Sequence, residues 1–380
     1  DFGFDGVFDP FTTSDVYSYS GDFGFITNST PERDSTSFYG QGTWNHSDSL
    51  RTVFGLRHTK DEVYSAVTNF YGRSGTDILE TDGNKVTGRL VVEKDIDDDT
   101  MLYGSFTRGY KPGGSNLTYG REDVVAQIVV LPTFQEEIVD AFEVGLKTDL
   151  ADGRVRLNTA AFLYNYEGLQ YQATDPEVFE GGVGNIPDSE IYGAELELSA
   201  FLSDSVIFDL RMSWLDTEIT AKHLALDNVE SEAATNALLA QGIGLFSSDV
   251  QAARAGRIQN VKGNELAKTP SFTGNVALNW TNDHNWGELK GTLQYTYRGG
   301  FKHRIFNNSQ TDLVPNYDVL DIMLGFYPAS AENQHFEIIG KNLFDQDGIN
   351  ARFTDVFGVG ATGDELIAPR QIMLRFVTQF

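Results

Sequence analysis

The sequence predicts an all-β protein, a transmembrane antiparallel up-and-down β-barrel, and three observations lead to this prediction. Apolar and polar residues alternate with a period of two in about fourteen segments. The connections between these segments are alternately short and long. The composition is rich in Phe (27), Tyr (16) and Gly (38) among 380 residues, with 10 Pro and no Cys. It suits twisted strands that are joined by tight turns.

The alternation is clearest in the segment 206–214. Its apolar row consists of Val206, Phe208, Leu210, Met212 and Trp214. The same pattern recurs at 272–280 and in the last segment, 371–380, which ends on Phe380. A strand with this pattern has one apolar and one polar face. The expected strands lie at 16–27, 34–46, 49–67, 84–95, 100–111, 137–149, 153–172, 188–202, 205–219, 269–282, 287–303, 314–328, 332–343 and 370–380.

The connections fall into two classes of length. The short ones are 46–48, 95–99, 150–153, 202–205, 282–286 and 328–333, and the link 28–33 is also short. The long ones are 68–83, 112–136, 173–187, 220–268, 304–313 and 344–369. A soluble sandwich has no reason to gather its long loops at one end, whereas a membrane barrel has tight periplasmic turns and long external loops. Within the long external insert at 220–268, the Ala- and Leu-rich run 229–241 predicts a short helix.

The polar row carries charges that a dry core could not bury at low cost. They are Arg154, Arg156, Glu195, Glu197, Glu288 and Lys290. We therefore expect the polar row to line a wet interior and the apolar row to face hydrocarbon. Four aromatic residues near strand ends, Trp214, Trp280, Tyr295 and Tyr297, are expected to form a girdle at the membrane interface. Packing within a soluble sheet is the alternative interpretation of these four.

Several functional classes are disfavoured. No run approaches 18 apolar residues, so no transmembrane helix is expected. A net charge of −27 disfavours nucleic acid as a partner. The six His are far apart and Cys is absent, so neither catalytic residues, nor a metal site, nor a cofactor is predicted. The run "GVGATG" (358–363) matches a dinucleotide-binding pattern, but Pro369 and a strand follow it instead of a helix, so we interpret it as a loop.

Four stretches go beyond generic alternation. They are "YGSFTRGYKPGGSN" (103–116), "FEVGLKTDLADGRVRLNTAAFLYNYEGLQ" (142–170), "IYGAELELSA" (191–200) and "GKNLFDQDG" (340–348). Together with "LRTVFGLRHT" (50–59), "PNYDVLDIMLGFY" (315–327) and the terminal Phe380, they resemble the barrel of TonB-dependent outer-membrane receptors. The resemblance covers residues 1–380 as a single domain, the C-terminal part of the barrel.

The resemblance implies a 22-stranded barrel that encloses a plug. We recognise neither a plug nor the box that binds the energy-coupling protein, so we expect the plug and the first strands upstream or in another chain. Otherwise, the strands present close on themselves as a smaller pore. The implied location is the outer membrane of a Gram-negative bacterium, in contact with its lipid and lipopolysaccharide. The implied partners are the TonB–ExbB–ExbD complex, reached through the missing N-terminal part, and a small ligand.

The implied function is the energy-coupled import of a ferric siderophore or a similar iron complex, without enzymatic activity. Cobalamin, haem or a carbohydrate could be imported by the same mechanism. We expect aromatic and basic residues on loops and external strand ends to bind the ligand, because ferric siderophores are often anionic. These candidates are Arg108, Tyr110, Lys111, Tyr171, Phe179, His303, Arg304 and Phe306. The alternative for each is a role in loop packing or in the girdle.

Three other functional classes remain open at this point. A passive porin of about fourteen strands would share the alternation and the loop pattern. It would lack a plug and would leak solutes from liposomes. A soluble β-rich protein that binds glycans or serves a structural role would be extracted without detergent. An enzyme of the outer membrane is the fourth possibility, although no catalytic motif supports it.

Overall fold

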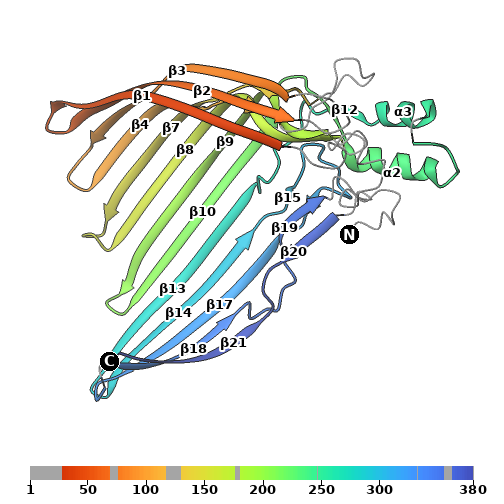
Figure 1. Cartoon of the computed structure of the whole chain (residues 1–380). Helices are drawn as coiled ribbons and strands as arrows, with labels where there is room; N and C mark the ends of the chain where they lie inside the picture. The colour runs from red at the N-terminus through yellow and green to blue at the C-terminus, as the bar shows by residue number, and fades with distance from the viewer. Residues whose placement is uncertain are drawn as a thin grey trace.

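Thirteen antiparallel strands form one continuous sheet, and they follow each other in the sheet in chain order. The computed structural model describes residues 28–68, 76–116, 130–175, 180–245, 247–331, 333–354 and 362–379. The sheet is curved like part of a cylinder wall (Figure 1). Its strands are β1 (Asn28–Ser47), β2 (Leu50–Thr68), β3 (Thr76–Asp95), β4 (Thr100–Lys111), β7 (Glu137–Leu150), β8 (Val155–Asp175), β9 (Glu180–Ser203), β10 (Val206–Ile219), β13 (Phe272–His284), β14 (Gly287–Arg298), β17 (Tyr317–Pro328), β18 (Gln334–Lys341) and β21 (Gln371–Thr378).

These strands confirm the expected all-β antiparallel architecture, and each matches one predicted segment. The one remaining expected strand, 16–27, lies outside the described residues, as does the terminal Phe380. The expected turn at 28–33 is wrong, because these residues form the beginning of β1. Pro31 is tolerated there because β1 is an outer strand of the sheet, where a missing backbone donor costs least.

Two long loops were also predicted wrongly. The expected loop 68–83 is shorter, because β3 already begins at Thr76. The expected loop 173–187 is mostly strand, because β8 extends to Asp175 and β9 begins at Glu180. Both hairpins extend past the region where one face is apolar. Where both faces of a strand are polar, the period-two pattern that identifies strands disappears.

The apolar residues of neighbouring strands form a single row across the sheet. Leu198, Leu210 and Val276 lie opposite one another across β9, β10 and β13, so their side chains share a face. This row is exposed, and Trp214 retains 47% and Leu374 82% of its accessible surface. Other exposed members of the row are Phe54, Leu90, Phe142, Val144, Phe272, Leu324, Phe336, Ile338 and Ile372. A continuous apolar surface of this extent is typical of contact with lipid or with another protein.

The alternate row is polar and is held together by hydrogen bonds between strands. Asn275 Nδ2 donates to Thr296 Oγ1 at 2.8 Å. Asn279 Nδ2 donates to Asp209 Oδ2 at 2.9 Å, and Thr292 Oγ1 donates to Asn279 Oδ1 at 2.9 Å. The amides, hydroxyls and carboxylate on this face therefore satisfy one another, while the neighbouring positions on each strand project to the opposite face.

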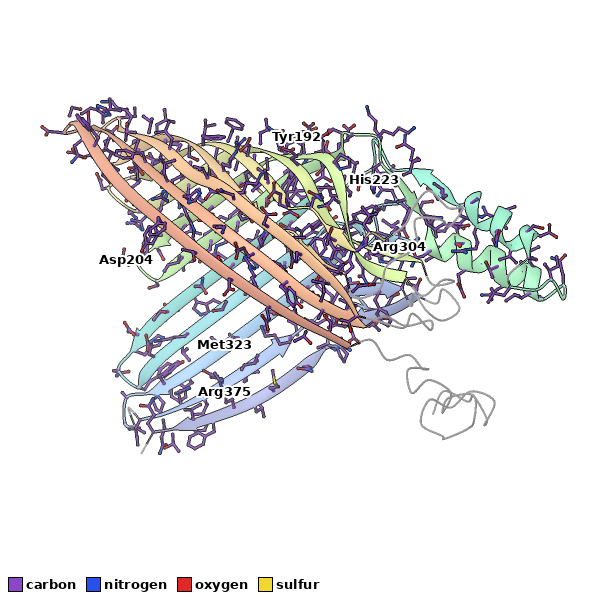
Figure 2. The ribbon with its side chains drawn as sticks, turned by 45° about the horizontal axis from the view of Figure 1, so that its top comes forward. Tyr192, Asp204, His223, Arg304, Met323 and Arg375 are labelled. Carbon is purple, nitrogen blue, oxygen red and sulfur yellow. The ribbon has the colours of Figure 1, made fainter. Side chains whose placement is uncertain are left out.

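The two rows lie on opposite sides of the curved sheet. Figure 2 shows Tyr192, a member of the apolar row, on the outer side of the sheet. The same view shows Met323 and Arg375 on the inner side. Met323 lies opposite Thr292, and Arg375 lies opposite Glu337, so both belong to the polar row. The apolar row therefore faces outwards and the polar row lines the hollow.

The predicted girdle residues all lie on the apolar row. Trp214 and Tyr297 are near the end that carries the long connections, and Tyr295 is one pair further in, opposite Val276. Trp280 is near the opposite end, where its ring covers Gly291. Their positions suit two aromatic belts, and their role at a membrane interface stays a prediction.

The long connections carry small elements of their own, all at one end of the sheet (Figure 1). The expected helix at 229–241 is confirmed as α2 (Asn228–Leu239). It is followed by an unpredicted short helix, α3 (Ser248–Ala255). No helix in the described part of the chain is long and apolar enough to cross a bilayer. The remaining small elements are the strand pairs β5 (Gly114–Ser115) with β6 (Thr133–Phe134), β11 (Leu224–Leu226) with β12 (Ile258–Asn260), β15 (Phe301–Lys302) with β16 (Leu313–Val314), and β19 (Ile349–Thr354) with β20 (Thr362–Leu366).

Candidate ligand-binding site

A cavity of about 940 Å³ lies among the long connections. Its walls come from the outer ends of β8 and β9, from the β10–β13 and β14–β17 connections, and from β19. Its volume is in the usual range for sites that bind a small molecule. Its aromatic and basic lining residues are Phe134, Tyr166, Tyr171, His223, Lys268, His303, Arg304, Phe306, Arg352 and Phe353.

The cavity is supported by a small core that joins the strand ends to the β10–β13 connection. Ile186, Ile219 and Val261 are completely buried in this core, and Tyr171 and Phe306 pack against it. Each fully buried aliphatic side chain stabilises the fold by about 1.5–3 kcal/mol. The connections are therefore packed against the outer ends of the strands, which gives the cavity a defined shape.

Glycine is required at position 168, where β8 enters the cavity wall. Gly168 has a φ of +69°, and a Cβ built on it would lie 2.5 Å from the Glu136 carbonyl oxygen. Any other residue would be strained and would clash with the backbone of the β4–β7 connection. Tyr171, three residues further on, is thereby placed in the cavity wall.

Tyr171 and His223 form an uncharged aromatic pair in this wall. Tyr171 Oη and His223 Nε2 are 2.9 Å apart, and the rings meet edge to face with centroids 5.4 Å apart. Burial raises the pKa of Tyr171 to about 12 and lowers the pKa of His223 below its usual value. Both groups are therefore neutral at pH 7, and the pair offers aromatic surface without a net charge.

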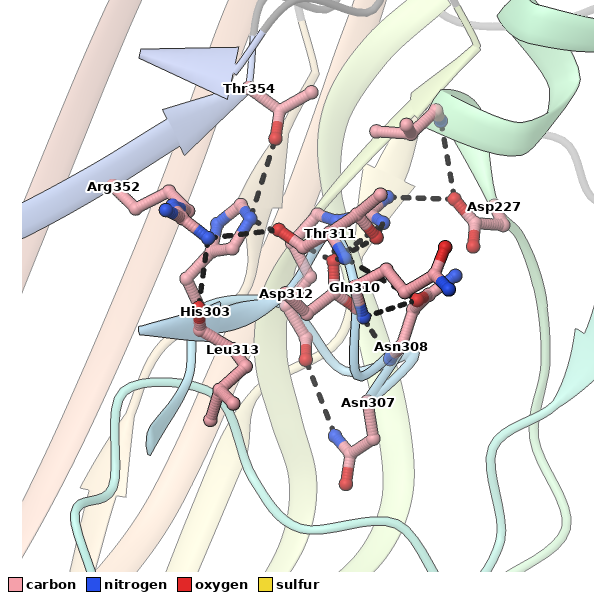
Figure 3. A network of polar contacts seen from close by, with 12 residues as sticks. Asp227, His303, Asn307, Asn308, Gln310, Thr311, Asp312, Leu313, Arg352 and Thr354 are labelled. Carbon is pink, nitrogen blue, oxygen red and sulfur yellow. Dashed lines mark hydrogen bonds and ion pairs between the residues drawn. The ribbon is translucent and has the colours of Figure 1, made fainter. Parts of the chain in front are cut away.

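Arg304 is engaged by buried carboxylates. Its Nη1 donates to Asp227 Oδ1 at 2.7 Å and its Nε donates to Asp312 Oδ1 at 2.7 Å. Figure 3 labels both aspartates within this network of polar contacts. Both aspartate side chains are 0% exposed. Asp227 also caps the N-terminus of α2 by accepting from Val229 N at 3.2 Å. We call Arg304, Asp227 and Asp312 the Arg304 staple, because it fastens the β15–β16 turn to the first turn of α2.

His303 is buried beside this staple and is neutral. Its Nε2 lies 3.5 Å from Thr354 Oγ1 and 3.8 Å from Asp312 Oδ1. Burial is the main cause that lowers the pKa of His303 to about 4. Arg304 and Arg352 lower it further, and Asp312 opposes them. At neutral pH this imidazole can donate or accept a hydrogen bond, but it adds no positive charge to the cavity.

Arg352 is also held by a carboxylate. Its Nε and Nη2 donate to the two oxygens of Asp364 at 2.6 and 2.8 Å, a bidentate pair across β19 and β20. Its Nη1 donates to the Leu313 carbonyl at 2.8 Å. The β19–β20 hairpin is thereby attached to β16, and the Arg352 guanidinium has its main anionic partner within the protein.

The cavity includes four of the eight predicted ligand residues, namely Tyr171, His303, Arg304 and Phe306. Arg108 lies elsewhere, in an exposed pair with Asp140 whose Nε–Oδ1 distance is 2.6 Å. Tyr110 Oη donates to Asp61 Oδ2 at 3.0 Å and lines a separate cavity of about 370 Å³. Lys111 ends β4 and belongs to neither lining, and Phe179 lies outside the described residues. The ligand role of all eight stays a prediction.

Sequence reasoning missed other lining residues, among them His223, Lys268 and Arg352. They lie in connections without periodicity, so no pattern indicates which side chains point inwards. The absence of carboxylates from the described lining was not predicted either. Although the chain has 55 acidic residues, the described residues that line the cavity include no Asp or Glu.

Comparisons with known proteins agree with this architecture. The model of the family "TonB dependent receptor-like, beta-barrel" matches residues 1–343. The ferric yersiniabactin uptake receptor FyuA from Yersinia pestis is similar at 18% identity and a TM-score of 0.69, over 93% of this chain and 47% of that chain. The siderophore receptor PiuA from Acinetobacter baumannii is similar at 17% identity and a TM-score of 0.65, over 91% of this chain and 43% of that chain.

A third similar structure is the ferric-catecholate import receptor Fiu from Escherichia coli K12. It matches at 16% identity and a TM-score of 0.61, over 93% of this chain and 45% of that chain. The chain therefore spans less than half the length of each of these three structures. The family model covers most of the chain, and the strand order of the sheet agrees with it. The chain belongs to the TonB-dependent receptor family and forms part of its β-barrel domain.

Proposed function

We propose that this protein imports an iron complex, specifically a ferric siderophore, across the bacterial outer membrane with energy supplied from the inner membrane. The observation that carries the proposal is the cavity of about 940 Å³ among the long connections, at the mouth of a receptor-type barrel wall. Its aromatic side chains and amides suit a compact organic ligand of mixed polarity. The three similar structures described above are named as a ferric yersiniabactin uptake receptor, a siderophore receptor and a ferric-catecholate import receptor.

The family places the chain in the outer membrane, and the dimensions of the apolar row fit that location. From Phe272 to Trp280 the row extends about 26 Å along β13, at about 3.3 Å per residue. A strand tilt of about 40° reduces this height to about 20 Å, near the apolar band of about 25 Å in outer-membrane barrels. Outer-membrane lipid therefore covers this row. We expect lipopolysaccharide to contact its charged outer margin, where Trp214 is followed by Asp216 and Tyr192 by Glu190.

The transport step proceeds without covalent chemistry, since members of this family are transporters rather than enzymes. The ligand first binds among the outer connections, where the core around Ile219 and the Arg304 staple hold the walls in place. The hydrogen-bonded polar row then provides a wetted wall for passage. We propose that a plug in the rest of the receptor blocks this route, and that the TonB–ExbB–ExbD complex moves it.

The experiment is uptake of radiolabelled iron by cells that express the intact receptor as their sole importer for one ferric siderophore. We expect uptake that saturates with ligand and stops when the inner-membrane potential is dissipated or TonB is deleted. A second receptor for an unrelated complex, expressed in the same cells, controls for cell viability. Uptake that continues unchanged without TonB would instead identify a passive porin and contradict the proposal.

A further inference from the structure

We propose that Lys268 determines specificity in the cavity by contacting one anionic group of the ligand, so that the site selects iron complexes with a single negative charge over polyanionic ones. The inference rests on the proposed function and adds the charge class of the ligand to it. It depends on three features of the cavity: the charges that line it, the partners of those charges, and the backbone that holds Lys268.

The lining differs in charge from the rest of the protein. The chain has a net charge of −27, yet the described lining residues include Lys268, Arg304 and Arg352 and no carboxylate. An anionic group would be repelled over most of such an acidic surface, because its field extends over about one Debye length. The cavity is thus a local region in which an anionic group of the ligand can bind.

The two arginines do not supply the charge for this binding. Arg304 is paired with Asp227 and Asp312, which are completely buried, and Arg352 forms a bidentate pair with Asp364. Each guanidinium is therefore compensated by carboxylates of the protein itself. The two histidines in the lining are neutral at pH 7, because burial lowers the pKa of both.

Lys268 is the remaining cation of the described lining. It is exposed, and the described residues provide no carboxylate that pairs with its ammonium group. A lysine ammonium has three donors and a flexible stem, so it can reach a ligand carboxylate or hydroxamate oxygen without a fixed geometry. One uncompensated cation matches one negative charge on the ligand.

The backbone at Lys268 is held in a conformation that favours glycine. Lys268 has a φ of +63°, and its N–H donates to the Lys302 carbonyl at 2.7 Å. The neighbouring Leu266 N–H donates to Thr217 Oγ1 at 3.0 Å, which fixes the same segment to β10. Such strained positions are enriched at functional sites. Glycine would relieve the strain, so lysine at this position provides the ammonium group at a cost in backbone energy.

Additional negative charges on a ligand would have no cation of their own. Arg304 is shared by two aspartates, Asp227 and Asp312, so this group has a formal net charge of −1 next to the cavity and would repel them. The repulsion acts in a partly buried region, where screening by salt is weak. The cavity should therefore discriminate against a trianionic complex even though its arginines suggest an anion site.

The test measures binding of three ferric complexes to the intact receptor by titration calorimetry. They are a ferric trihydroxamate with one free carboxylate, the methyl ester of the same compound, and a trianionic ferric tris-catecholate. The variants are Lys268→Gln, Lys268→Arg and Lys302→Gln. Lys302 is the matched control, because it is adjacent in space through its carbonyl but does not line the cavity.

We expect the unmodified receptor to bind the carboxylate form most tightly and the tris-catecholate most weakly. Lys268→Gln should lower the affinity for the carboxylate form about tenfold, the loss expected for one charge-assisted hydrogen bond. It should also reduce the loss of affinity that added salt causes for the carboxylate form, and leave the affinity for the ester unchanged. Lys268→Arg should retain most of the preference, and Lys302→Gln should change none of these values.

Three results would overturn the inference in distinguishable ways. If the unmodified receptor binds the acid and the ester equally, or if Lys268→Gln weakens both alike, Lys268 does not select charge while iron-complex binding stands. If the tris-catecholate binds most tightly, the charge class is wrong. If the folded receptor binds no ferric complex at all, the proposed function is contradicted, and the inference is contradicted with it.

Discussion

At the scale of single residues, the structure distinguishes charged side chains that are available to a ligand from those that are paired within the protein. Arg304 is predicted to be a ligand residue because it is basic and lies in an external connection. Its partner Asp227 is 77 residues away in the chain, so no local pattern could reveal that the two meet. Tyr171 and Phe306, selected for their aromatic rings, also line the cavity, whereas Tyr110, selected on the same ground, lines a separate one. Residue type alone therefore indicates candidates for a ligand site, and contacts between distant segments decide which of them lie together.

The Arg304 staple yields the first prediction. Arg304→Met should destabilise the outer connections by about 3–5 kcal/mol, because it leaves two buried carboxylates without their cation. Hydrogen exchange of the backbone amides in the first turn of α2 should increase accordingly. Arg108→Met is the matched control, since it removes an exposed pair with Asp140 that contributes about 0–1 kcal/mol. Equal effects of the two substitutions would show that the staple is not structural.

Protonation of His303 yields the second prediction. The pKa of His303 is about 4 in the folded protein, below the unfolded value of about 6.5. Between about pH 4 and 6.5 the folded state therefore binds fewer protons at His303 than the unfolded state. The contribution of the neutral His303 to stability is complete above about pH 6.5 and is lost as the pH decreases towards 4. The amides of the β15–β16 turn should lose protection over this range, by about 3 kcal/mol. His303→Gln should remove this pH dependence, whereas His284→Gln, at the far end of the sheet, should leave it.

At the scale of elements, the strands that contact two different environments were predictable and the others were not. β10 and β13 alternate between apolar and polar residues along their length, and their predicted boundaries, 205–219 and 269–282, agree within a few residues. Residues 173–175 of β8 and 180–187 of β9 lack this alternation, so they were interpreted as part of a loop. Period-two alternation therefore indicates that the two faces of a strand contact different environments. It does not identify a strand whose two faces are alike.

The contact between Trp280 and Gly291 yields a prediction at this scale. A Cβ at Gly291 would lie 2.0 Å from Trp280 Cζ2, so Gly291→Ala should displace the ring and disturb the β13–β14 pair. We expect outer membranes to contain less folded receptor. The amount is measured as the heat-modifiable band after electrophoresis of unboiled samples. At Gly104, where the nearest atom is 3.9 Å away, Gly104→Ala should be tolerated. Normal amounts of folded Gly291→Ala receptor would contradict the proposed contact.

At the scale of the whole molecule, the sheet and the family define the architecture but not the ligand. Thirteen strands in chain order form a curved wall, and β1 and β21 are its two outer strands in the described part of the chain. The neighbouring structures are about twice as long as this chain, which matches 47%, 43% and 45% of their respective lengths. The division into an outward apolar row and an inward polar row applies to the whole sheet, and both the membrane location and the transport route depend on it.

The most direct test of this division is spin-label accessibility along β13. The chain has no Cys, so single cysteines can be introduced at positions 273–279 and labelled in the intact receptor in lipid vesicles. We predict that labels at 274, 276 and 278 collide with dissolved oxygen, which concentrates in lipid, and are protected from a water-soluble nickel chelate. Labels at 273, 275, 277 and 279 should show the reverse. Accessibility that does not alternate along β13, or that alternates in the opposite phase, would contradict the assignment of the two faces.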